Sequence, residues 1–170
     1  MRNHFPKWLI IILAVIVGLS ALCLFYSQER IETYQIHMRQ KWPEVQLRLA
    51  ELSKDMDEAA VKAHFAGLSL SCRNDPASNL GDRMCYADVD KANGMSALGV
   101  AVALRKGKLT HAIVMVPWWA HGRWFDSLTS HYGPAVGSPV IRWSMPNGSL
   151  EFNRNRSINP LEWSVVFFSA

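Results

Sequence analysis

The patterns that mark most catalytic and metal sites are missing from this sequence of 170 residues. It contains no C-x-x-C, no H-x-x-x-H or H-E-x-x-H, and no G-x-S-x-G that would set a nucleophile on a turn between a strand and a helix. The acidic residues between Asp75 and Asp90 do not follow the spacing of an EF-hand loop. These absences predict a protein that is not an enzyme and that uses no metal or cofactor.

A strong excess of one charge is missing as well. The chain carries 18 Lys and Arg residues and 14 Asp and Glu residues. Arg2 and Lys7 precede a long apolar run, which leaves 16 basic residues against 14 acidic ones in the rest of the chain. Such a balance argues against nucleic acid as the partner. With 49% hydrophobic residues, the chain is also too apolar to be disordered.

The apolar run from Trp8 to Tyr26 contains no charged residue. As a helix it would be about 28 Å long, close to the ~30 Å hydrocarbon core of a bilayer. Aromatic residues stand at both ends, where a membrane helix favours them. The run exceeds the roughly 7–15 residues of a signal-peptide core. We therefore predict an uncleaved transmembrane signal anchor after a cytoplasmic tail of residues 1–7. The alternative is a processed signal, or lipid attachment at Cys23, although Leu22 stands where a lipoprotein signal needs a small residue.

The basic residues on the two sides of the apolar run are nearly balanced and do not set its orientation. Cysteine placement instead indicates which side of the membrane holds the rest of the chain. Cys23 lies inside the apolar run, and only Cys72 and Cys85 remain, on either side of a polar loop. We predict that these two form a disulfide bond, which implies an oxidising compartment. The chain would then be a single-pass protein of the inner membrane with its C-terminal domain in the periplasm. The alternative is a pair of unrelated buried thiols.

The segment after the apolar run has apolar residues at helical spacing, from Ile31 to Leu52. We predict a juxtamembrane helix over residues 27–53 with a kink near Pro43. Its apolar stripe would either pack on the domain that follows or pair with a second chain, which would make a homodimer through the span and the stalk.

Residues 54–170 alternate between helical and strand patterns, and we predict a periplasmic α+β domain. Asp55 and Glu58 form a capping pattern for a helix that ends at Gly67. A further helix is expected at Trp119–Tyr132. The expected strands are Leu68–Cys72, Asp82–Val89, Met95–Leu104, Leu109–Val116, Pro139–Met145, Ser149–Asn153 and Leu161–Phe168. Helices packed on one face of an antiparallel meander sheet would form two layers, with helix-plus-meander repeats at residues 54–117 and 118–170.

The stretch Met56-Asp57-Glu-Ala-Ala-Val61-Lys-Ala-His-Phe65-Ala-Gly67 resembles the start of the small outer-membrane assembly lipoproteins, the BamE (SmpA/OmlA) family. Asp57 stands at the family's capping position, and Gly67 comes one residue late. The chain has no lipobox. The resemblance implies a unit of two helices and a three-stranded meander, which in tandem gives the β-lactamase-inhibitor-protein type of architecture. It also implies a binding or assembly-accessory module of the cell envelope.

The most unusual stretch is the aromatic-rich junction before the last predicted helix. It combines indole rings with a basic and a titratable side chain, which suits a binding platform. Its candidate binding residues are Trp118, Trp119, His121, Arg123 and Trp124. The alternative is that these rings belong to the core and cover the edge of the sheet.

Three functions follow from these features as expectations. The first is a membrane-anchored periplasmic binding or accessory module, without catalytic activity, that engages another envelope protein. The second is recognition or hydrolysis of a cell-wall glycan, with His121, Arg123 and Asp126 beside the aromatic platform. The third is a structural subunit of an inner-membrane complex, in which the span is the interface.

Overall fold

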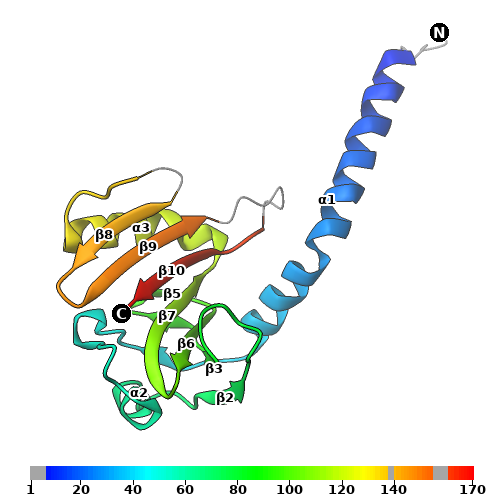
Figure 1. Cartoon of the computed structure of the whole chain (residues 1–170). Helices are drawn as coiled ribbons and strands as arrows, with labels where there is room; N and C mark the ends of the chain where they lie inside the picture. Colours follow the sequence, from blue (N-terminus) through cyan, green and yellow to red (C-terminus); the bar gives the residue numbers. More distant parts are fainter. Residues whose placement is uncertain (1–6, 138–139, 155–160) are drawn as a thin grey trace.

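The computed structural model describes residues 7–137, 140–154 and 161–170 (Figure 1). The predicted tail at residues 1–6, the strand start at Pro139 and the loop at residues 155–160 lie outside the described residues, as do the side chains of Cys23 and Tyr26. The helices are α1 (Lys7–Arg39), α2 (Glu58–His64) and α3 (His121–Tyr132), with 3₁₀ turns at Leu49–Glu51 (η1) and Trp118–Ala120 (η2). The strands are β1 (Glu44–Val45), β2 (Ser71–Asn74), β3 (Arg83–Asp88), β4 (Lys91–Ala92), β5 (Met95–Ser96), β6 (Gly99–Arg105), β7 (Lys108–Val116), β8 (Ile141–Met145), β9 (Gly148–Arg154) and β10 (Ser164–Ser169).

Seven strands form one antiparallel sheet in the order β2-β3-β6-β7-β10-β9-β8. The last strand in the sequence, β10, therefore lies inside the sheet, between β7 and β9. A small second sheet joins β1, β4 and β5. Helices α2 and α3 pack on one face of the large sheet (Figure 1), which confirms the predicted α+β class.

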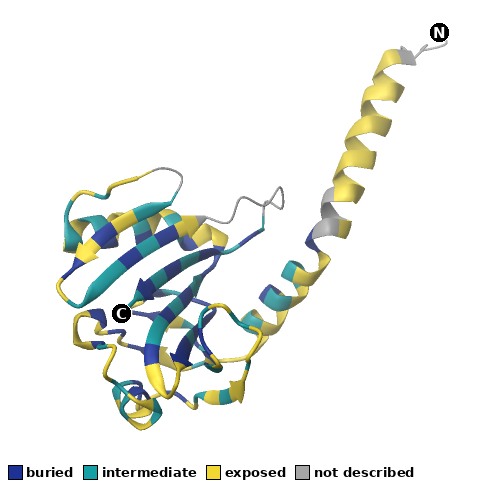
Figure 2. Cartoon of the chain, viewed as in Figure 1, coloured by how far each residue is buried: buried dark blue, intermediate teal, exposed yellow. Residues whose placement is uncertain are grey.

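The core lies between this sheet face and the two helices. Alternate residues of the central strands point into it, among them Val102, Val114 and Phe168, whose exposures are 0–2%. Figure 2 shows buried and half-buried residues alternating along β7 and β10. Burying one such side chain contributes about 1.5–3 kcal/mol relative to leaving it exposed. The sheet is therefore held mainly by this face.

The predicted helix over residues 27–53 differs from the structure, because α1 ends at Arg39. Pro43 has no N–H to donate and disfavours helix at the residue before it. Beyond Pro43 the chain forms an N-terminal strap, residues 44–52, in which β1 pairs in parallel with β4 and the 3₁₀ turn η1 follows. Val45, Leu47 and Leu49 are buried in the core at a period of two. The strap thus belongs to the α+β domain.

Helix α1 is divided between a free part and a docked part. No single helix of the described residues is long and apolar enough to cross a membrane, but Trp8–Leu22 and Ser27–Arg39, bent by 60°, meet that test together. The second part packs on the domain. The Tyr34 hydroxyl donates to the Leu161 carbonyl at 2.9 Å, and Arg30 Nη2 lies 3.1 Å from Glu162 Oε1. Tyr34, a residue of the predicted apolar stripe, thus packs on the protein's own domain, whereas Met38 of the same stripe is 70% exposed.

A disulfide bond joins Cys72 to Cys85, as predicted. The two residues stand opposite each other in the register of β2 and β3. The bridge therefore ties the edge strand β2 to its neighbour, and it is consistent with an oxidising compartment.

Candidate functional site

The structure divides the predicted aromatic platform between the core and the surface. Trp124 has an exposure of 0% and lies in the core, and its indole Nε1 donates to the Ser96 carbonyl at 2.9 Å. His121 is half-buried, shares a 2.6 Å hydrogen bond with Ser164 Oγ through Nδ1, and stacks on the Phe152 ring at 4.6 Å. Both side chains therefore serve the fold.

The other members of the platform stay at the surface. Trp118 and Trp119 are 44% and 47% exposed, and their rings meet edge to face at 5.8 Å. Arg123 is exposed in the first turn of α3. Asp126, which the glycan hypothesis placed with His121, is exposed, whereas His121 Nδ1 is turned toward Ser164.

A large hollow with an apolar lining lies elsewhere, on the face of the sheet opposite α2 and α3. Here the residues that alternate with the core residues are also apolar and only half-covered. They line a groove of roughly 690 Å³, which we call the outer-face groove. Its floor is formed by Met84, Tyr86, Ala101, Ile113, Met115, Trp163, Val165 and Phe167.

Strand register explains how this floor is assembled from distant parts of the chain. Tyr86 pairs with Ala101, Ala101 with Ile113, and Ile113 with Phe167, so that one row crosses β3, β6, β7 and β10. Neighbouring strands lie about 4.7–4.9 Å apart, and cross-strand side chains on one face touch. The row is therefore a continuous apolar surface.

The two ends of the groove differ. At one end the rim residues are Arg73 of β2 and Asp75 and Leu80 of the loop that follows it. His111 Nδ1 and the Thr110 hydroxyl both hydrogen-bond to the Leu80 carbonyl, at 3.2 and 2.8 Å, which holds this loop over the sheet.

At the other end the groove meets helix α1. A smaller hollow of roughly 250 Å³ lies between the helix and the sheet and shares Tyr86, Met115 and Trp163 with the groove. Ile36 and His37 of α1 line its helical side. The apolar surface thus extends from the loop after β2 to the docked part of α1.

Two titratable side chains at the groove, Tyr86 and His111, are held in their neutral forms. Burial, and then a hydrogen bond donated to Asp88, raise the pKa of the Tyr86 hydroxyl. Burial lowers the pKa of His111, so that its ring is neutral at pH 7. The guanidinium of Arg30 lies 3.7 Å over the Trp163 ring but is paired with Glu162. The floor therefore offers apolar contact rather than charge.

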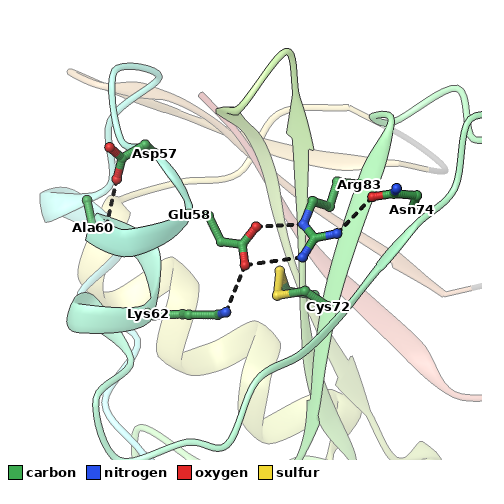
Figure 3. A network of polar contacts seen from close by, with 8 residues as sticks. Asp57, Glu58, Ala60, Lys62, Cys72, Asn74 and Arg83 are labelled. Atoms are coloured by element: carbon green, nitrogen blue, oxygen red, sulfur yellow. Dashed lines mark hydrogen bonds and ion pairs between the residues drawn. A yellow bond between two sulfur atoms is a disulfide. The ribbon is translucent and has the colours of Figure 1, made fainter.

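A cluster of charged side chains lies beside the disulfide (Figure 3). Glu58 accepts hydrogen bonds from Arg83 Nε at 2.6 Å and from Lys62 Nζ at 2.7 Å, and Arg83 Nη1 donates to Asn74 Oδ1 at 2.8 Å. The bonds from Arg83 and Lys62 lower the pKa of Glu58 to about 2. Figure 3 places the cluster between α2 and the strands that the disulfide joins.

Glu58, Cys72 and Cys85 also come close enough to hold a metal ion by distance alone. The two sulfur atoms are bonded to each other, however, and the carboxylate is occupied by Arg83 and Lys62. A disulfide sulfur is not a thiolate ligand. We assign this cluster to the fold, where it fixes α2 against the edge of the sheet.

The groove was not among the residues that the sequence singled out. A weak signal for it exists, because β7 and β10 carry apolar residues on both faces: Ile113, Met115, Val165 and Phe167 occupy positions that a one-sided sheet gives to polar residues. Unbroken apolar runs of this kind also occur in strands covered on both faces, so that the run alone does not identify a binding surface.

No known protein family, curated protein or solved structure matches this chain. The resemblance of residues 56–67 to the outer-membrane assembly lipoproteins accordingly stays an expectation.

Proposed function

We propose that this protein is a membrane-anchored binding module without catalytic activity, whose outer-face groove takes an apolar segment of another envelope protein. One observation carries the proposal: across β3, β6, β7 and β10, the sheet face opposite α2 and α3 is apolar and only half-covered. In antiparallel sheets with a single helical layer, the free face is normally solvated and polar. An apolar free face of this size is typical of an interaction surface.

The side chains of the groove favour a protein segment as the occupant. Protein interfaces are enriched in aromatic residues and methionine at their centre. Tyr86, Trp163 and Phe167 supply the rings, while Met84 and Met115 supply flexible side chains that adapt to a partner. The rim carries charge of both signs, on Arg73 and Asp75. A polar rim around an apolar centre suits a peptide, whose backbone and side chains need both.

The membrane anchor is the second part of the proposal. We infer that Trp8–Tyr26 spans the inner membrane uncleaved, with the amino terminus in the cytoplasm and the domain in the periplasm. The disulfide between Cys72 and Cys85 supports this orientation, since such bonds persist in oxidising compartments. The docking of Tyr34 and Arg30 on the domain supports a short tether.

The element order supports an accessory module of the tandem type. Helix α2 precedes the meander β2-β3-β6-β7, and helix α3 precedes the meander β8-β9-β10. We interpret these halves as two helix-plus-meander units, whose division lies near residues 117 and 118. The resemblance of residues 56–67 implies a tandem of the same general kind, although its unit has two helices and a three-stranded meander.

Site-specific photocrosslinking in native membranes tests the groove. A benzoylphenylalanine is placed at Ile113 or Phe167, and at Ser144 on the edge strand β8 as the control. We expect the same partner peptide, identified by mass spectrometry, from both groove positions and not from Ser144. Adducts that are equal at all three positions, or a homodimer alone, would contradict the proposal.

The purified partner then allows a quantitative test. Met115→Lys places a charge on the apolar floor and should weaken binding about tenfold or more, because the partner's apolar groups would lie against it. The control is Ser144→Lys, on the exposed side of β8. Equal affinities of the two variants, with unchanged thermal unfolding, would locate the binding surface elsewhere.

A further inference from the structure

Trp118 and Trp119 are large apolar side chains that the outer-face groove does not use. They form the turn η2 directly after β7, and both rings are close to half-exposed. The Trp119 ring packs on Tyr34 of α1 at 5.1 Å. The pair therefore lies beside the helix that leads into the proposed membrane span.

The position of this contact along α1 places the pair near the bilayer surface. Ser27 follows the proposed span directly and is only 3% exposed, so that packing begins where the span ends. Tyr34 lies eight residues after Tyr26, or about 12 Å further along a helix. If the part of α1 before the bend stands upright in the bilayer, the 60° bend halves the distance that these eight residues advance along the bilayer normal, to ~6 Å. The headgroup layer on each side of a bilayer is about 5–7 Å thick.

The chemistry of the pair fits that layer. Tryptophan is enriched at the membrane–water interface, where its ring meets acyl carbon and its N–H meets polar groups. Arg123 is exposed one turn after Trp119. Basic side chains near the surface attract anionic lipid headgroups. The two rings and the cation together have the composition of an interfacial membrane contact.

We propose that Trp118, Trp119 and Arg123 rest in the headgroup layer of the bilayer that holds the anchor, with Arg123 facing anionic phospholipid. The inference rests on the proposed membrane anchoring. The domain then has two attachments to the bilayer, the span and this contact, which together fix its orientation. The outer-face groove is held at a constant angle to the membrane.

Fluorine NMR of the full chain tests this contact. The protein carries 7 tryptophans, which are labelled as 5-fluorotryptophan and assigned by single Trp→Phe variants. It is placed in nanodiscs of phosphatidylethanolamine and phosphatidylglycerol that contain a lipid with a gadolinium chelate on its headgroup. We expect several-fold stronger broadening of Trp118 and Trp119 than of Trp143, which is buried and lies on the edge strand β8.

The Trp8 resonance distinguishes a failure of the headgroup contact from a failure of the membrane anchor on which that contact rests. Broadening of Trp8 without broadening of Trp118 and Trp119 would leave the anchor standing and overturn the headgroup contact. Absence of broadening at all three would overturn the anchor itself.

A charge variant tests the role of anionic lipid. Arg123→Gln should reduce the broadening of Trp118 in discs with phosphatidylglycerol, and the reduction should be smaller in discs of phosphatidylcholine alone. Arg73→Gln, at the rim of the groove, is the matched control and should leave Trp118 unchanged. An unaltered resonance of the buried Trp124 verifies the fold of each variant. Equal effects of the two variants would overturn the assignment of Arg123.

Discussion

Trp119 and Trp124 are five positions apart and have opposite surroundings. Trp124 is enclosed in the core and donates a hydrogen bond to the Ser96 carbonyl, whereas Trp119 is 47% exposed. We predict that Trp124→Phe lowers the free energy of unfolding by about 2–4 kcal/mol, because it leaves a cavity and an unpaired carbonyl. Trp118→Phe should stay within about 0.5 kcal/mol. Urea unfolding followed by circular dichroism measures both, and similar losses would contradict the placement of Trp124.

The charged cluster at Glu58 predicts a dependence of stability on pH. The pKa of Glu58 is lowered to about 2 in the folded state by Arg83 and Lys62. A carboxyl group whose pKa is lower in the folded than in the unfolded state stabilises the fold at pH values above the unfolded-state pKa. This stabilisation is lost as the pH falls through the folded-state pKa. Glu58→Gln should thus lower Tm at pH 7 by less than about 4 °C, since surface ion pairs contribute little.

The difference between wild type and Glu58→Gln should shrink as the pH falls from about 4.5, the usual range of a free carboxyl, toward 2. Thermal unfolding at a series of pH values measures it. Asp126→Asn, an exposed carboxylate on α3, is the control and should show no such trend. A constant difference down to pH 2 would show that Glu58 acts through packing rather than charge.

For single residues, the sequence predicted the roles of some side chains and not of others. The pairing of Cys72 with Cys85 was predictable, because two cysteines flanked one polar loop. The separate roles of Trp119 and Trp124 were not predictable. A strand period of two would have turned Trp118 and Trp119 to opposite sides, but β7 ends at Val116 and the 3₁₀ turn leaves both rings at the surface.

Among the elements, the N-terminal strap depends on a turn at the far end of the domain. The Asn147 amide in the β8–β9 turn donates to the carbonyls of Leu49 and Leu52, at 2.8 and 2.7 Å. Asn147→Ala should destabilise the fold by about 1–3 kcal/mol, because these carbonyls lose their donor. Asn153→Ala, on the exposed side of β9, is the control. Hydrogen exchange of the strap amides measures the local effect, and unchanged protection would argue against this role.

The disulfide gives a prediction for the edge of the sheet. Alkylation of denatured, non-reduced protein should modify Cys23 alone, and reduction should expose all 3 cysteines. Replacing both Cys72 and Cys85 with serine should cost about 3 kcal/mol of stability, from the entropy of a short closed loop. Cys23→Ser should leave stability unchanged. Free thiols at Cys72 and Cys85 before reduction would remove the argument for an oxidising compartment.

Most elements after residue 68 were predictable to within a few residues, since their alternation and turn residues agree. The single strand expected at Met95–Leu104 was wrong, because the structure divides it into β5 of the small sheet and β6 of the large one. Asn147-Gly148 and Lys106-Gly107 mark two of the tight hairpins, and Lys106 and Gly107 adopt φ values of 51° and 75°. The strap was missed because Val45 and Leu49 fit both a helical stripe and an extended segment. Leu47, buried between them, follows the period of two that the structure has.

For the whole molecule, the groove depends on strand order, which local sequence does not encode. Its floor joins Tyr86 to Phe167 across four strands. Each residue by itself is an ordinary apolar strand position. Only the pairing of β10 with β7 brings strands from the middle and the end of the sequence together into one surface.

The side of the membrane that holds the domain can be tested with reporter fusions. Alkaline phosphatase fused after Ala170 should be active, because it folds only where disulfides form. Green fluorescent protein at the same position should be dark, and at Met1 it should fluoresce. The reverse pattern would place the domain in the cytoplasm.

The interior position of β10 has a consequence for biosynthesis. During synthesis from the amino end, β7 is made well before residues 164–169, whereas β9 ends at Arg154, shortly before them, and until β10 appears both strands carry unpaired backbone edges. The sheet closes only when β10 enters between them, so that its two halves cannot join before residues 164–169 are available. During that interval the unpaired edges of β7 and β9 can pair with other chains, so that the protection of both strands from aggregation depends on β10.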